Sequence, residues 1–365
     1  MMYHHDNRPY QQAASDAART MRDKLATRIA VGRRTGAAAI QRILTEVPND
    51  RIVSGAAVTF ASDDTGLKVH YGRVIETVHP HALGQMAESA RMPRTFLGYL
   101  QEQGAWGQGL AARTLNELFA HDPDRHLIRS VGGQTRSMLS TKYRRLHPGM
   151  LMEAFQTACT QVGAVAYEAV CTDTRWVVKA VLQEVVEPVR DEVLALGVVI
   201  HESPHGAGAT EISPFIERMW CTNKAVCSSE LRRVHLGSRL DAVGVEWSDE
   251  TVLADTRVMC LQIQDLVRGQ LDANAIRKLE AAVRSAHEQQ IDHTKFEAFL
   301  RKNLSRDEAD RVVGKFASAD IELLPMGNTA WRASNALSWF AGEVTDPERA
   351  FEIQKLAGAM LPRAA

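Results

Sequence analysis

Short apolar runs separated by turn residues occupy the middle of the chain, and this alternation predicts β-hairpins. Gly132-Gly133 provides the positive φ angles of a tight turn between two runs, and the polar pair Asp173-Thr174 separates the next two. The three predicted hairpins pair residues 126–131 with 134–140, 162–172 with 175–186, and 193–200 with 209–212. We therefore expect an antiparallel meander in the middle of the chain.

Helical periodicity flanks this meander on both sides. Ser213-Pro214 has the order of an N-cap and a first helical residue, which predicts a helix over residues 215–225. Thr114 and Glu117 have the spacing of a capping box, and residues 106–109 contain two glycines that indicate a loop. The other predicted helices cover residues 79–90, 95–103, 112–120, 251–271, 274–290, 309–317 and the span 331–360, with a second capping box at Ser305 and Glu308.

These elements predict an α+β fold, in which antiparallel hairpins pack against helices and the C-terminal region is helical. Residues 1–27 are polar and rich in alanine and glutamine, so we expect a flexible N-terminal arm or a marginal helix there. The α+β core then covers residues 28–247, and a helical C-terminal extension covers residues 248–365. The order of the elements is not that of a doubly wound nucleotide-binding fold.

The overall charge sets limits on partners and location. Lys and Arg number 43 and Asp and Glu number 44, so a nucleic-acid surface would require local segregation of charge. Five irregularly spaced cysteines suit a reducing compartment better than a disulfide framework. No run approaches the length of apolar chain that spans a bilayer, and no signal peptide is visible. We expect a cytoplasmic protein without membrane contact.

His201, Glu202 and His205 spell the HExxH motif of zinc hydrolases. That chemistry requires both imidazoles on one helix, one turn apart, with the glutamate beside the metal-bound water. Pro204 lies between the two histidines, and Gly206 and Gly208 follow, which indicates a turn between strands. We expect no metal here. Neither a phosphate-binding glycine loop nor a catalytic triad is recognisable, so we expect no cofactor, no nucleotide hydrolysis and no enzymatic activity.

Positive charge accumulates in one stretch, because residues 126–152 contain no Asp or Glu. We call its cations, Arg129, Arg136, Lys142, Arg144 and Arg145, the basic ribbon, and Tyr143 lies among them. Cations along phosphates and an aromatic ring against unstacked bases are the requirements of single-strand binding. An ordinary solvated sheet edge is the structural alternative, since lysine and arginine also discourage aggregation there. A second, more diluted basic patch contains Lys224, Arg232 and Arg233.

Three runs carry a resemblance to a known family. RSVGGQTRSMLSTKYRRLHP, GVVIHESPHGAGATEISPFIERMWCTN and GNTAWRASNALSWFAGEV resemble phage- and plasmid-borne proteins of domain-of-unknown-function family 932, over about Val69 to Leu361. Family members typically have NSE-GxGA where this chain has HESPHGAGA, and CTNG where it has Cys221 to Lys224. The order of elements is also similar to the ring-forming single-strand annealing proteins of the RecT, Red-beta and Rad-type superfamily, which is an analogy of fold.

The resemblance and the basic ribbon together imply a single-stranded DNA-binding and annealing protein of a phage or mobile element, acting in DNA recombination. Its partners would be single-stranded DNA and further copies of itself in a homo-oligomer or ring. One alternative is a protein-interaction or anti-defence accessory protein, which predicts that the basic residues are dispersed once the chain folds. The other is a zinc hydrolase that uses His201, Glu202 and His205.

Overall fold

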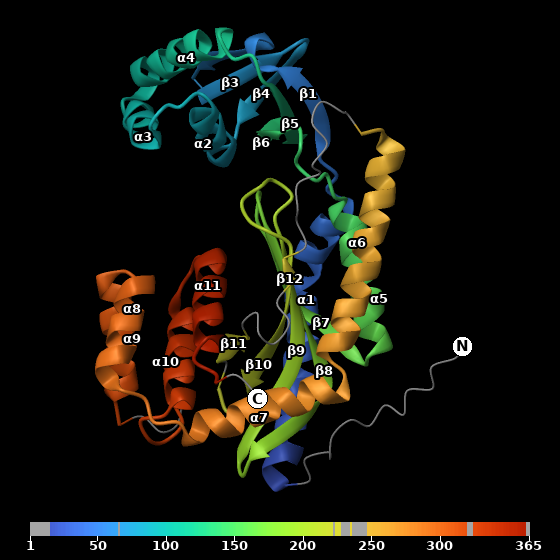
Figure 1. The fold of residues 1–365 in the computed structure, drawn as a ribbon, viewed down its shortest axis with the longest axis vertical. Coiled ribbons are helices and arrows are strands. Elements are labelled where there is room, and N and C mark those ends of the chain that lie inside the picture. The colour runs from blue at the N-terminus through green and yellow to red at the C-terminus, as the bar shows by residue number, and fades with distance from the viewer. Residues whose placement is uncertain are drawn as a thin grey trace.

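The computed structural model describes residues 15–64, 66–221, 223–227, 234–235, 247–319 and 324–362. The chain forms two sheets, each with its own helices (Figure 1). Sheet A contains β1 to β6 and forms the first unit with α2, α3 and α4, at the top of Figure 1. Sheet B contains β7 to β12 and forms the second unit with α1, α5 to α7, α10 and α11. The α+β class is therefore confirmed, with two sheets where a single meander was predicted. No helix among the described residues has the length and apolarity to cross a membrane.

Sheet A has the strand order β1-β5-β6-β4-β3-β2, and its pairs are antiparallel except β4 with β6. Helices α2, α3 and α4 pack on it around a core that includes Met86, Leu115 and Phe119. The hairpin of β5 and β6 turns at Gly132 and Gly133, whose φ angles are 59° and 78°. The elements are β1 (Asn49–Ser54), β2 (Val58–Asp63), β3 (Gly66–Tyr71), β4 (Val74–Val78), β5 (Arg125–Val131), β6 (Gln134–Ser140), α2 (Pro80–Ser89), α3 (Arg94–Glu102) and α4 (Gly104–Ala120).

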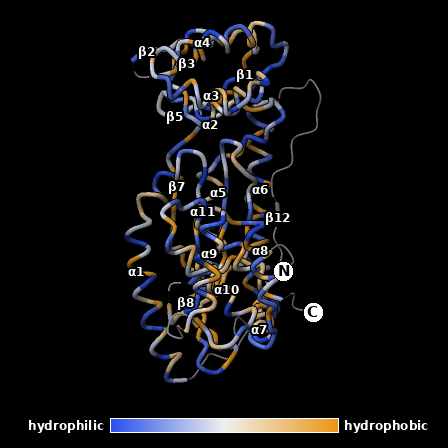
Figure 2. The backbone as a smooth tube through the Cα atoms, turned by 90° about the vertical axis from the view of Figure 1, so that its left-hand side faces the viewer, coloured by the Kyte–Doolittle hydropathy of each residue, from blue (hydrophilic) through white to orange (hydrophobic). Residues whose placement is uncertain are grey.

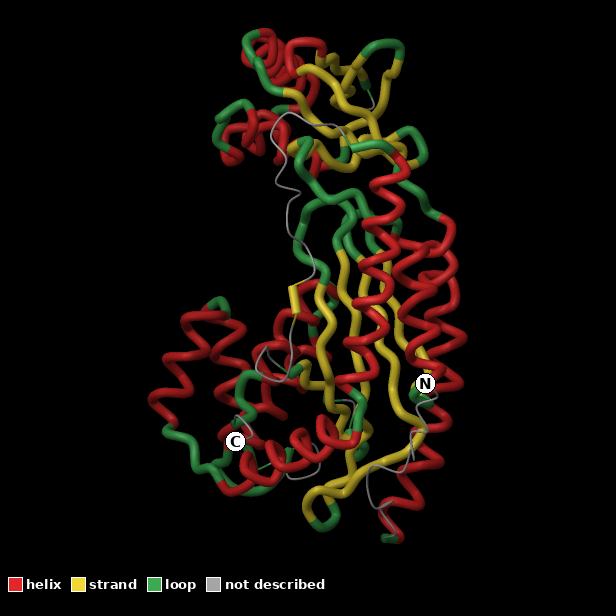
Figure 3. Tube along the Cα trace, turned by 45° about the vertical axis from the view of Figure 1, so that its right-hand side comes forward, coloured by secondary structure: helices red, strands yellow, loops and turns green. Residues whose placement is uncertain are grey.

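Sheet B has the order β11-β10-β9-β8-β7, and β12 also pairs with β10. All its pairs are antiparallel, and the two hairpins predicted in this part of the chain are confirmed. Figure 3 shows its long strands running beside the helices of the same unit. The strands are β7 (Ala164–Cys171), β8 (Trp176–Val189), β9 (Glu192–Glu202), β10 (Glu211–Arg218), β11 (Lys224–Val226) and β12 (Val234–His235).

Helices cover both faces of sheet B, and hydrophobic residues lie between the sheet and these helices (Figure 2). One face packs on α5, α6 and α7 through residues such as Trp176 and Val178. The opposite face packs on α1 and on Phe351 of α11. The helices of the second unit and the C-terminal region are α1 (Asp16–Thr45), α5 (Pro148–Gln161), α6 (Asp249–Gln270), α7 (Ala273–Glu288), α8 (His293–Asn303), α9 (Arg306–Ala317), α10 (Ala330–Glu343) and α11 (Pro347–Gly358). The helical C-terminal region is confirmed, including the capping box at Ser305 and Glu308.

Two local predictions are wrong. Residues 215–218 continue β10, whose eight residues are all buried, and no helix follows Pro214. The Pro214 carbonyl accepts from Cys227 N at 2.9 Å, one residue beyond the end of β11, so the proline lies where the pairing of β10 with β11 ends. Residues 106–109 lie inside α4, and Thr114 bonds the carbonyl of Leu110 within that helix. Neither a loop nor a capping box is present there.

The expected N-terminal arm also needs correction. Residues 16–27 are the first turns of α1, which begins at the N-cap Ser15 and buries Ala18, Met21 and Leu25 against sheet B. Gly32 and Gly36 let this helix approach β7 closely, because a Cβ at Gly32 would lie 2.3 Å from the Tyr167 carbonyl oxygen. Residues 1–14 lie outside the described residues. The helix is therefore part of the packed second unit.

Candidate functional site

The arginines of the basic ribbon are used inside the protein. Arg129, on β5, is only 3 % exposed; its Nε donates to Asp50 at 2.7 Å, and a terminal nitrogen donates to the Pro204 carbonyl. Arg136, on β6, is buried and pairs with Glu46 and Asp173. These guanidinium groups hold strands and loops together, because their charges face carboxylates from distant parts of the chain.

Past β6 the ribbon runs between the two units. Arg144 makes a two-pronged ion pair with both carboxylate oxygens of Asp255 on α6. Arg145 donates to the Trp247 carbonyl at 3.2 Å. The Tyr143 hydroxyl donates to the Ser203 carbonyl at 2.8 Å, and burial raises the pKa of this phenol. Its ring therefore has a structural position, unlike a stacking platform that faces solvent.

The second predicted patch is described only at Lys224. Its ammonium pairs with Glu168, which also bonds Lys179 at 2.7 Å. Burial alone would raise the pKa of the Glu168 carboxyl, but the two ammonium groups lower it well below its usual value. Arg232 and Arg233 lie outside the described residues. Among the described members of both patches, only Lys142 and Arg145 have no carboxylate partner. The predicted contact with nucleic acid gains no support from these positions.

His205, the last residue of the HExxH motif, lies in the connection between the two units, whereas His201 and Glu202 end β9. We call residues 203–210, between β9 and β10, the joint loop. The His205 carbonyl accepts from Gln85 Nε2 at 3.1 Å and lies 2.9 Å from His81 Nε2, so the loop contacts α2 of the first unit. His201 instead stacks on Phe351 of α11, with ring centroids 5.3 Å apart. The two imidazoles thus contact different elements, and no metal-binding group of three or more His, Cys, Asp or Glu side chains occurs among the described residues.

Burial shapes the protonation of this segment. Burial raises the pKa of Glu202 to about 8, against the opposing charge of Arg129. Burial also lowers the pKa of His205 to about 3, helped by Arg129 and Arg136, and lowers that of His201 to about 4. All three side chains are therefore neutral near pH 7. A glutamic acid that is neutral near pH 7 cannot act there as the general base of an HExxH site.

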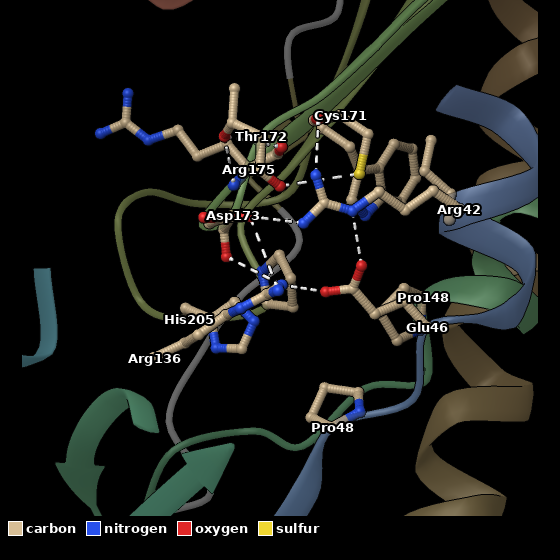
Figure 4. A pocket seen from close by; sticks show the side chains of 13 residues that line it. Arg42, Glu46, Pro48, Arg136, Pro148, Cys171, Thr172, Asp173, Arg175 and His205 are labelled. Carbon is tan, nitrogen blue, oxygen red and sulfur yellow. Dashed lines mark hydrogen bonds and ion pairs between the residues drawn. The ribbon is translucent and has the colours of Figure 1, made fainter. Parts of the chain in front are cut away.

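A small cavity lies beside the joint loop, where Figure 4 shows Arg42 and Arg136 directed toward Glu46 and Asp173. Its volume is about 20 Å³, room for one water. Arg136 and Arg175 are among its lining residues, and the buried Nε atom of each has no acceptor among the described residues. The charges of the lining arginines are balanced by carboxylates: Arg42 and Arg136 by Glu46 and Asp173, and Arg175 by Glu348. We assign this cavity a structural role.

A different surface carries the exposed aromatic side chains of the first unit. Phe96 and Tyr99 lie one turn apart on α3 and are 43 % and 54 % exposed, and Trp106 in the first turn of α4 is 63 % exposed. We call these three residues the α3–α4 aromatic surface. The two helices meet closely at this corner, because a Cβ at Gly107 would lie 1.9 Å from the Leu100 carbonyl oxygen.

Sequence reasoning missed this surface because it assigned residues 106–109 to a loop. The available signal was compositional: aromatic residues make up 6 % of the chain, yet three fall within the short stretch from Phe96 to Trp106. Nothing in that stretch distinguishes an exposed aromatic from a core residue before the packing of α3 and α4 is known.

Comparison with known proteins supplies no further guide. Searches against protein families, curated proteins and solved structures found no match to this chain.

Proposed function

We propose that the protein is a non-enzymatic interaction protein, which binds an extended apolar segment of another protein on the α3–α4 aromatic surface. The observation that carries the proposal is the exposure of Phe96, Tyr99 and Trp106 at one corner of the first unit. Aromatic residues at the centre of an interface contribute large contact areas at little entropic cost, and Trp and Tyr dominate binding hot spots. Exposed aromatic side chains on two adjoining helices gain from being covered by a partner.

The charges around this surface favour a protein over a nucleic acid. The exposed cations Arg91, Arg94 and Arg113 are matched by the exposed acids Glu88, Glu102 and Glu117. Arg94 is paired with Glu88 at 2.7 Å. A single-strand site requires a surplus of positive charge along the phosphates, and this surface has none.

A peptide library tests the proposal. Random peptides displayed on phage are selected on the full-length protein, and the enriched peptides are labelled and measured by fluorescence anisotropy. We expect Trp106→Ala and Tyr99→Ala each to weaken binding by about tenfold or more. Ile75→Ala, at an exposed apolar position on β4, is the matched control and should bind normally. Failure to enrich any peptide, or equal binding to all three variants, would refute the proposal.

Single-stranded DNA binding is the second candidate, and it rests on Lys142 and Arg145, which lie three residues apart in the sequence and lack carboxylate partners among the described residues. Labelled oligothymidine measured at low and high salt distinguishes the two functions. The DNA proposal expects binding that falls with salt and is lost in the Lys142→Ala/Arg145→Ala double variant. The protein-interaction proposal expects no binding in either buffer.

A further inference from the structure

Helix α6 presents an apolar stripe to solvent. Its inner side buries Val252, Met259 and Ile263, and the last two belong to the core beneath sheet B. Its outer side exposes Ala254, Val258 and Leu261, the last two by 49 % and 61 %. Figure 1 shows α6 on one side of the molecule, packed beside α5.

The outward positions repeat at the spacing of a coiled-coil seam. Ala254, Val258, Leu261, Asp265 and Arg268 follow one another at alternating intervals of four and three residues. Such a repeat keeps one stripe of a helix facing a partner helix. The β-branched Val258 and the longer Leu261 lie at the centre of this stripe. An isolated exposed valine needs no explanation, but a valine and a leucine in register on one stripe suit a second helix.

The charges on α6 identify that second helix. The first turn contains Asp249 and Glu250, and the last turn contains Arg268. When two copies of α6 are placed antiparallel with Val258 opposite Leu261, the same register brings Thr251 opposite Arg268 and Glu250 beside it. The acidic start of each helix then meets the basic end of the other. Two-fold symmetry repeats every contact, and the opposed helix dipoles add to the attraction.

We propose that the protein self-associates through antiparallel pairing of α6 with α6 of a second copy. The pair is isologous, so Val258 and Leu261 form two equivalent central contacts, with an ion pair at each end. The pairing lies on the second unit, whereas the α3–α4 aromatic surface lies on the first. The dimer is therefore independent of the proposed protein partner.

Light scattering coupled to size exclusion on the full-length protein tests the pairing. We expect a concentration-dependent dimer, and Leu261→Asp should yield a monomer that keeps its helical circular dichroism, because Leu261 is exposed in the protomer. Val31→Asp, at an exposed position on α1, is the matched control and should remain dimeric. A wild-type monomer at every concentration, or a dimer unaffected by Leu261→Asp, would overturn the proposal.

A charge exchange tests the register. Glu250→Arg and Arg268→Glu should each shift the dimer toward monomer, since each places like charges opposite one another. The double variant carries both changes in every chain, so it restores opposite charges at both ends and should recover the dimer. Absence of recovery would contradict the antiparallel register. Trp106→Ala should leave the dimer unchanged, which separates this result from the peptide-binding experiment.

Discussion

At the scale of single residues, ionisable groups in the interior act through neutralisation or pairing. Glu202 is the clearest case of neutralisation, because burial raises the pKa of its carboxyl from 4.5 to about 8. Between these two pH values the folded protein holds a proton that the unfolded chain releases. The contribution of this retained proton to the free energy of unfolding is therefore complete below pH 4.5, and it decreases as the pH rises toward 8.

Replacement of Glu202 by glutamine tests this linkage. The amide keeps the shape of the neutral acid and does not titrate, so the variant should lose less stability than the wild type between pH 5 and 8. We expect the difference to be roughly 2–4 kcal/mol, since one unit of pKa corresponds to about 1.4 kcal/mol. Urea unfolding at both pH values measures it, and Glu102→Gln, at an exposed site, is the control. Parallel pH dependence of Glu202→Gln and wild type would contradict a raised pKa.

At the scale of elements, close backbone approaches set how helices dock. Gly32 and Gly36 place α1 against β7, since a Cβ at Gly36 would lie 3.1 Å from the Ala169 backbone nitrogen. The edge strand β2 of sheet A is also covered by a neighbouring element. Asn116 on α4 accepts from Phe60 N at 2.7 Å and donates to Phe60 O at 2.9 Å, so a side-chain amide covers the outer edge of β2. Both features limit where another strand or helix could pack.

A matched pair of glycine substitutions tests the docking of α1. Gly32→Ala should destabilise the protein by about 2 kcal/mol or more, because the new methyl meets a backbone carbonyl that cannot move away cheaply. Gly98→Ala on α3 meets open space and should stabilise by about 0.5–1 kcal/mol through helix propensity. Thermal unfolding compares the two variants. Equal effects would mean that α1 does not approach β7 as closely as described.

The local hairpins and the C-terminal helices could be predicted because their signals lie within a few residues. The Ser213-Pro214 pair led to a wrong prediction, because an N-cap followed by proline is a local signal. Strand β10 instead depends on burial of both of its faces by distant parts of the chain. The internal pairing of the basic ribbon was not predicted, for a related reason. The carboxylates that pair with Arg129 and Arg144 are 79 and 111 residues away in sequence, so no charge count along the chain could identify them.

At the scale of the whole molecule, the joint loop is one of the contacts that relate the two sheets. Arg129 connects β5, β1 and the joint loop through Asp50 and the Pro204 carbonyl. Tyr143 and Gln85 add bonds to Ser203 and His205. The segment that spelled a metal site therefore has a mechanical role, since it reaches the unit of sheet A together with the β7–β8 turn, where Asp173 pairs with Arg136.

Removal of one such contact should affect the whole protein. Arg129→Ala leaves Asp50 and the Pro204 carbonyl without their donor, and we expect a loss of about 3–5 kcal/mol of stability. Lys142→Ala, in the same ribbon and without a carboxylate partner, should change stability by less than about 0.5 kcal/mol. Denaturant unfolding followed at Trp106 in the first unit and Trp331 in the second would show whether the units separate. Similar stability in both variants would mean that Arg129 does not hold the units together.

The two ends of the described chain share one face of sheet B, where Ala18 of α1 and Phe351 of α11 belong to the same buried cluster. Because synthesis runs from the N-terminus, α1 and the strands of sheet B emerge before α11. Until then, the side of the sheet that Phe351 covers in the finished protein stays open, with Val199 and Phe215 among its residues. Nascent chains are most prone to aggregate in that interval, and translation of the last described helix is the step that closes it.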